Sequence, residues 1–128
     1  MGTGTEIGRV RGLGSAHEGT HHWWRQRLTA GGNIALMGWL LFSLARLPGY
    51  SFADVHLWLQ SAWVAVPMGL LVLNVFYHFR LGLQVVIEDY QHDETRVVLL
   101  ILLNLYTAVL IAVALFAILK LAFTGAAR

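Results

Sequence analysis

The sequence predicts an all-α fold, a bundle of three transmembrane helices that follows a polar N-terminal segment at the membrane interface. Of its 128 residues, 57% are hydrophobic and only 12% are charged, whereas a soluble domain carries about 25% charged residues. Charges are absent from three runs of 18, 25 and 23 residues, at 28–45, 55–79 and 97–119. Because a helix needs about 20 mostly apolar residues to cross a bilayer, each run predicts one membrane span.

We expect a single transmembrane domain over residues 1–128, with spans near 30–48, 58–88 and 96–123. Pro48-Gly49 predicts the end of the first span, because proline removes a backbone donor and glycine permits turn conformations. The second span is longer than the bilayer requires, so we expect it to tilt or to project beyond the membrane surface.

The first span and the loop after it carry opposite signals for helix formation. Gly31, Gly32 and Gly38 lower the helix propensity of the span. In the following loop, Ser51 and Asp54 are candidate caps for a further helical turn.

Composition also excludes several classes of protein. Without cysteine, the chain has no disulfide framework and no thiolate metal site. Its formal net charge of +2 is too small for a nucleic-acid-binding surface. We therefore expect no nucleic-acid partner, and a lipid bilayer as the surroundings of the chain.

Lysine and arginine beside the spans predict the orientation, because cytoplasmic loops carry an excess of these residues. Five lie on one side and three on the other: Arg9, Arg11, Arg25, Arg27 and Arg96 against Arg46, Lys120 and Arg128. We expect a cytoplasmic N-terminus and a periplasmic C-terminus. The first 27 residues have neither the apolar region of a signal peptide nor the composition of an organelle presequence, so we expect a bacterial inner membrane.

His78 is the most informative polar residue, because it lies well inside the second predicted span. An ionisable side chain there costs roughly 2.5–3.5 kcal/mol to insert, so it needs a structural or a functional reason. The structural reason is a neutral histidine hydrogen-bonded to a neighbouring helix. The functional reason is ligation of haem iron, for which a neutral imidazole is a good ligand. The sequence pattern by itself is compatible with both.

The three spans contain no second histidine that pairs with His78 as a haem ligand. His56 precedes the second span and is about 33 Å from His78 along a helix axis. If His78 ligates haem, the ligand on the other face of the haem must therefore come from another subunit.

Three further polar residues follow His78 on the same predicted helix. Arg80 either extends its guanidinium toward the membrane surface, which is the more common outcome, or faces a buried anion. Tyr90 is either an interfacial anchor or, beside Asp89, a group that hydrogen-bonds a quinone carbonyl and helps to deliver protons.

The N-terminal segment combines histidine, tryptophan and arginine. Trp23 and Trp24 suit the headgroup zone of a membrane. His17 and His21 are four residues apart, a spacing that can bind metal on a helix, but Gly19 interrupts the turn and no carboxylate or cysteine completes a site. An interfacial segment is the better interpretation.

The segment 78–90 resembles a motif of the small hydrophobic membrane anchor subunit of succinate dehydrogenase, the D-type subunit of respiratory complex II. The motif is a histidine, a glycine four residues later, and Asp-Tyr at eleven and twelve: His78, Gly82, Asp89 and Tyr90. The resemblance implies that His78 is an axial ligand of haem b, its iron shared with a histidine of the companion C-type anchor subunit. It also implies that Tyr90 hydrogen-bonds ubiquinone, with Asp89 beside it.

The N-terminal stretches 12–16 and 25–30 resemble the bacterial forms of the same subunit. The match in length, number of spans and orientation covers essentially the whole chain. By this resemblance, Arg27 and His21 are expected near the haem propionates, with the adjacent His22 as the alternative to His21.

The expected function is therefore an electron-transfer anchor that has no catalytic activity alone. Its expected partners are the C-type anchor, the iron–sulfur subunit and the flavoprotein subunit of a succinate:quinone oxidoreductase. Two alternatives come from other functional classes: a small oligomeric transporter with Arg80, Glu88 and Asp89 as a charge relay, and a purely structural assembly subunit in which His78 is only packed.

Overall fold

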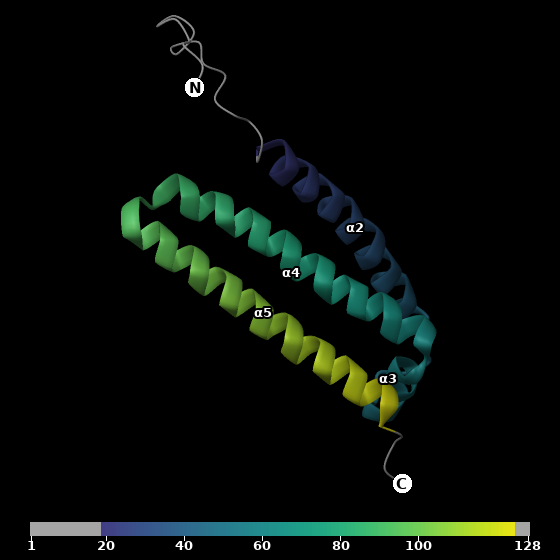
Figure 1. Cartoon of the computed structure of the whole chain (residues 1–128). Coiled ribbons are helices and arrows are strands. Elements are labelled where there is room, and N and C mark those ends of the chain that lie inside the picture. The colour runs from purple at the N-terminus through teal and green to yellow at the C-terminus, as the bar shows by residue number, and fades with distance from the viewer. Residues whose placement is uncertain (1–18, 125–128) are drawn as a thin grey trace, which may run out of the picture.

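The computed structural model describes residues 19–124, which form four helices and the short segments between them (Figure 1). The helices are α2 (Gly19–Ala45), α3 (Phe52–Gln60), α4 (Ala62–Tyr90) and α5 (Asp93–Phe123). Three of them, α2, α4 and α5, are long and apolar enough to cross a membrane, with 27, 29 and 31 residues. No strand occurs within residues 19–124, and the predicted all-α fold with three spans is confirmed.

Helix α2 begins at Gly19, well before the start predicted near residue 30. Once a helix is nucleated, each added residue contributes a further backbone hydrogen bond, so the polar turns before the apolar run continue the same helix. In those turns the rings of Trp23 and Trp24 stack at 5.9 Å. The guanidinium of Arg27 lies 4.9 Å from the Trp23 ring centroid. At the other end α2 stops at Ala45, shortly before Pro48-Gly49.

The short helix α3 lies in the loop between the first two spans, and its caps are the residues that the sequence predicts. The Ser51 hydroxyl accepts from the Asp54 N–H, and the Asp54 carboxylate accepts from the Ser51 N–H at 3.3 Å. This reciprocal arrangement satisfies two backbone donors at the helix start. Ser61 then separates α3 from α4 in an extended conformation, so the second span begins at Ala62 rather than near residue 58.

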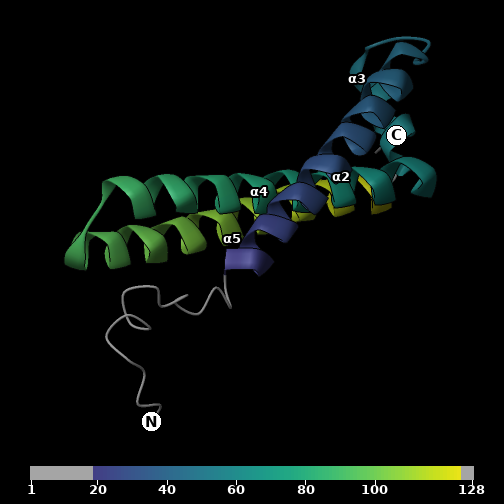
Figure 2. The ribbon, with the colours of Figure 1, turned by 90° about the horizontal axis from the view of Figure 1, so that it is seen from above.

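Helices α4 and α5 form a long antiparallel hairpin, and α2 crosses this pair at an angle (Figures 1 and 2). The connection between them is Gln91-His92, after which Asp93 has a φ of 54°, a left-handed conformation that aspartate tolerates better than most residues. The Gln60 Nε2 donates to the Thr124 carbonyl at 3.2 Å, which links the end of α3 to the end of α5. The close packing of α2 is against α4, not α5, so α4 is the central helix.

Few apolar side chains in the described region are buried, and large ones are exposed along all three long helices. The buried apolar residues lie on α4 and α5: Val64, Leu71, Leu81 and Leu103. Exposed apolar surface on this scale marks contact with lipid or with partner subunits. Side chains are buried where the helices contact one another, whereas the outward-facing apolar side chains are available to contact other membrane components.

Polar groups join α2 to α4 within the span. Asn74 Nδ2 on α4 donates to the Thr29 carbonyl at 2.8 Å and to Asn33 Oδ1 at 2.7 Å. Gly32 faces the same amide, and a Cβ at that position would lie 2.9 Å from Asn74 Nδ2. The glycine therefore permits the close approach that the amide hydrogen bonds require.

We expect Gly32→Ala to lower the thermal stability of the chain within its membrane complex, while Gly31→Ala does not. An added methyl at position 32 displaces Asn74 from its two acceptors, and overpacking of this kind costs about 1–3 kcal/mol. At Gly31 an added Cβ meets no atom within 4 Å, which makes it a matched control. The measurement is thermal melting of the detergent-solubilised complex. Equal melting temperatures for the two variants would contradict the expected role of Gly32.

Candidate functional site

His78 lies one helical turn after Asn74 and extends the polar contact between α4 and α2. Its Nδ1 is 2.9 Å from the hydroxyl oxygen of Thr29, which is buried with 7% of its surface exposed. Within the described part of the chain, no hydrogen-bond partner is found for His78 Nε2. The His78 ring is thus held by α2 through its Nδ1.

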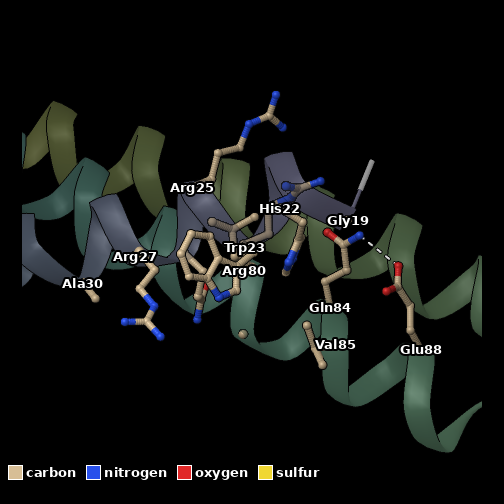
Figure 3. Close-up of a pocket in the computed structure, with 13 residues that line it drawn as sticks. Gly19, His22, Trp23, Arg25, Arg27, Ala30, Arg80, Gln84, Val85 and Glu88 are labelled. Atoms are coloured by element: carbon tan, nitrogen blue, oxygen red, sulfur yellow. Dashed lines mark hydrogen bonds between the residues drawn. The ribbon is translucent and has the colours of Figure 1, made fainter. Parts of the chain in front are cut away.

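A pocket of about 900 Å³ lies between the first turns of α2 and the second half of α4 (Figure 3), lined by Ala30 and Arg80 near this contact but not by Thr29 or His78 themselves. Gly82 borders it, and a Cβ there would approach Gln26 Nε2 at 3.6 Å. His22 and Gln26 also line the pocket, and each has a buried polar atom, Nε2 and Oε1 respectively, without a hydrogen-bond partner among residues 19–124. Buried polar atoms are normally paired, so we expect a group outside the described residues to pair with these two.

The charged groups that line the pocket are mainly cationic. They are three arginines and one glutamate: Arg25, Arg27, Arg80 and Glu88. The Glu88 carboxylate already accepts a hydrogen bond from Gln84 Nε2 at 2.9 Å (Figure 3). In Figure 3 the Arg25 side chain points away from the other labelled side chains, whereas Trp23 lies among them. The balance of charge favours an anionic group in this pocket.

Arg80 is held by a hydrogen bond to a neighbouring helix. Its Nε donates to the side-chain oxygen of Asn104 on α5, and the residue is half-buried and lines the pocket. The structure thus adds a contact of Arg80 with α5 that the sequence did not predict.

Of the residues predicted to lie near the haem propionates, some line the pocket and one does not. Arg27 lines the pocket, and so does His22. His21 is exposed and does not line the pocket. Successive helical residues are about 100° apart around the axis, so only one of the two adjacent histidines faces α4. His17 lies outside the described residues, as does the stretch 12–16.

Asp89 and Tyr90 are the last two residues of α4, and the structure does not bring them to His78. The helix is continuous from Ala62 to Tyr90, so twelve residues separate His78 from Tyr90 by about 18 Å. Both side chains are exposed, Tyr90 by 76%. They form a polar end of α4 that is open to a ligand or to another subunit.

Sequence reasoning assigned no role to Thr29, although its partner His78 stood out. Thr29 and Asn33 are four residues apart, as are Asn74 and His78, and residues at this spacing share a helix face. Two such polar pairs in apolar spans are the signal that predicts a cross-helix contact.

Comparisons with known proteins give the family. The sequence-family model of the succinate dehydrogenase/fumarate reductase transmembrane subunit matches residues 1–119. The chain is 37% identical over 105 residues to the succinate dehydrogenase hydrophobic membrane anchor subunit of Rickettsia bellii, covering 80% of this chain and 82% of that protein. It belongs to this family.

Two further relatives carry the same name. The anchor subunit of Rickettsia conorii is 36% identical over 117 residues, which is 87% of this chain and 92% of the relative. That of Paracoccus denitrificans is 30% identical over 112 residues, with 88% and 87% covered. No solved structure matches the chain at a significant level. The resemblance seen in segment 78–90 is confirmed, and the chain is a multi-pass membrane anchor subunit of succinate dehydrogenase rather than a small transporter.

Proposed function

We propose that this anchor subunit holds haem b together with the C-type anchor subunit, with His78 as one of the two axial ligands of the haem iron. The observation that carries the proposal is the state of the His78 ring, whose Nδ1 lies 2.9 Å from the Thr29 hydroxyl while Nε2 has no partner within the described residues. Metal-bound histidines are commonly held in this way through the second ring nitrogen. Bound haem supplies a one-electron carrier.

The pocket beside His78 also fits the group. A haem carries two propionate carboxylates, and the pocket offers the guanidinium groups of Arg27 and Arg80 together with His22 Nε2, which has no partner in the described part of the chain. Charge-assisted hydrogen bonds from arginine suit carboxylates well. We propose Arg27 and His22 as the propionate contacts, with His21 as the weaker candidate because its side chain is exposed.

The second axial ligand must come from a partner. His56, on α3, is the only described histidine between the first span and His78, and it lies at the opposite end of α4. The exposed apolar faces of the long helices offer the surface on which a second anchor subunit packs. The proposed C-type partner therefore supplies both a histidine and a covering helix face.

We further propose that Tyr90 and Asp89 contribute to the ubiquinone site. Their exposed position at the end of α4 leaves the tyrosine hydroxyl free to hydrogen-bond a quinone carbonyl. The iron–sulfur subunit docks at the same end and delivers electrons that the flavoprotein subunit takes from succinate. With His78 about 18 Å along the helix from Tyr90, a haem held by His78 would lie deeper in the membrane than a quinone held by Tyr90.

We expect the end of α4 that carries Tyr90 to face the cytoplasm of a bacterium, with the chain in the inner membrane and its C-terminus periplasmic. The reason is the excess of arginine beside that end and in the N-terminal segment. Alkaline phosphatase, which is active only in the periplasm, is expected to be active when fused after Arg128 and inactive when inserted after His92. The reverse pattern would overturn this orientation.

The reduced-minus-oxidised optical spectrum of the purified four-subunit complex tests the haem proposal. A b-type band at a ratio of one haem per complex supports it. A complex that contains all subunits and oxidises succinate, yet has no such band, would show that the anchor is purely structural in this respect.

A further inference from the structure

We propose that Thr29 is a positioning residue for the haem ligand: its hydroxyl accepts the Nδ1–H of His78, and it thereby selects the tautomer in which Nε2 binds iron. This inference rests on the proposed haem function. It adds a residue of α2 to the set that determines the properties of the haem, although Thr29 itself touches neither iron nor quinone.

The direction of the hydrogen bond follows from the surroundings of the Thr29 hydroxyl. Its oxygen lies 2.8 Å from the Arg25 carbonyl oxygen and 3.1 Å from the Gln26 carbonyl oxygen. Carbonyl oxygens only accept, and a hydroxyl has a single proton. That proton must point to the carbonyl groups, because otherwise three oxygens would face one another with no hydrogen between them. The hydroxyl lone pairs are then left for His78, so its Nδ1 is the donor.

The tautomer of the imidazole follows from this direction. With the proton on Nδ1, a neutral His78 has its lone pair on Nε2, which is the nitrogen without a partner in the described region. A hydrogen bond from Nδ1–H also makes the opposite nitrogen a stronger electron donor to a metal. Stronger donation stabilises ferric over ferrous iron, so the Thr29 contact lowers the midpoint potential of the haem.

Further hydrogen bonds, one within α2 and one from α4, hold Thr29 in position for this contact. The Thr29 hydroxyl is bonded back to its own helix, and the Thr29 carbonyl accepts from Asn74 Nδ2 at 2.8 Å. Asn74 is one turn from His78 on α4. The same residue of α2 therefore sets the register of the two helices through its carbonyl and orients the imidazole through its hydroxyl.

Thr29→Val tests the inference in the assembled complex, because valine keeps the branched shape and removes the acceptor. We expect the haem midpoint potential to rise, the low-spin ferric signal to shift in electron paramagnetic resonance, and haem affinity to fall roughly tenfold or more. Thr29→Ser keeps the hydroxyl and is expected to retain the original potential. Thr107→Val is the matched control, since Thr107 is 3% exposed and its hydroxyl, among the described residues, bonds only to the Leu103 carbonyl of its own helix.

The outcomes separate this inference from the haem proposal. If the unaltered complex contains no haem, the proposed function itself is wrong. If Thr29→Val holds haem with unaltered potential and resonance spectrum, or if Thr29→Ser shifts the potential equally, the positioning role is wrong. Should the valine variant fail to assemble, Thr29→Cys is measured instead. Its thiol is a weaker acceptor, so a smaller shift in the same direction supports the inference and an unchanged potential contradicts it.

Discussion

Replacing His78 with alanine is expected to remove the haem b band from the reduced-minus-oxidised spectrum of the purified complex. Residues that only orient a metal ligand typically contribute 10- to 100-fold to metal affinity, so loss of the ligand itself should reduce haem affinity by more than roughly 100-fold. The variant must be compared at equal amounts of all four subunits, measured by staining of the purified complex.

His92→Ala is the control for His78→Ala. His92 is exposed, directly precedes α5 and makes no side-chain capping bond within residues 19–124, so its removal should leave the haem band unaltered. A haem band of normal intensity in His78→Ala would contradict the ligand assignment. That result would support the structural interpretation instead, in which His78 only joins α4 to α2 by its hydrogen bond to Thr29.

Tyr90→Phe is expected to lower succinate:ubiquinone reductase turnover by about 100-fold, the scale of a lost proton-transfer group. Succinate oxidation with an artificial acceptor should persist, because that acceptor takes electrons before they reach the membrane subunits. Both activities are measured on the same purified sample.

Tyr106→Phe provides the matched comparison for the tyrosine at the end of α4. Tyr106 is also exposed, by 57%, but it lies in the middle of α5, and we expect its removal to leave both activities unchanged. An equal loss of the two activities in Tyr90→Phe would indicate a defect of assembly and count against a role in quinone binding.

The spans and the linear spacing of the candidate residues could be predicted from the chain alone. Charge-free runs predicted 58–88 and 96–123, and the observed helices are Ala62–Tyr90 and Asp93–Phe123. Insertion into a bilayer depends mainly on the polarity of consecutive residues, so it can be judged without knowledge of neighbours. The break at Ser61 could not be found in this way, because apolar residues continue on both sides of it.

The helix contacts were not predicted, because the usual guide to the buried face of a helix is an apolar stripe. Helices that are apolar all round lack such a stripe, and their rotation depends on small and polar groups instead. Gly32 illustrates the point. From composition it only weakens a helix, whereas in the fold it makes room for the Asn74 amide. The same holds for His22 and His21, of which only His22 turns toward α4.

By itself, the sequence determined that this is a three-span membrane subunit with one intramembrane histidine, and that Tyr90 lies about three turns of helix beyond it. These features follow from local polarity and from the fixed rise of an α-helix. Only the tertiary structure decided that Thr29 meets His78 and that Arg80 is held by Asn104 beside a cationic pocket. Such pairs depend on how one helix is rotated and shifted against another, and that is determined by cross-helix packing and hydrogen bonds.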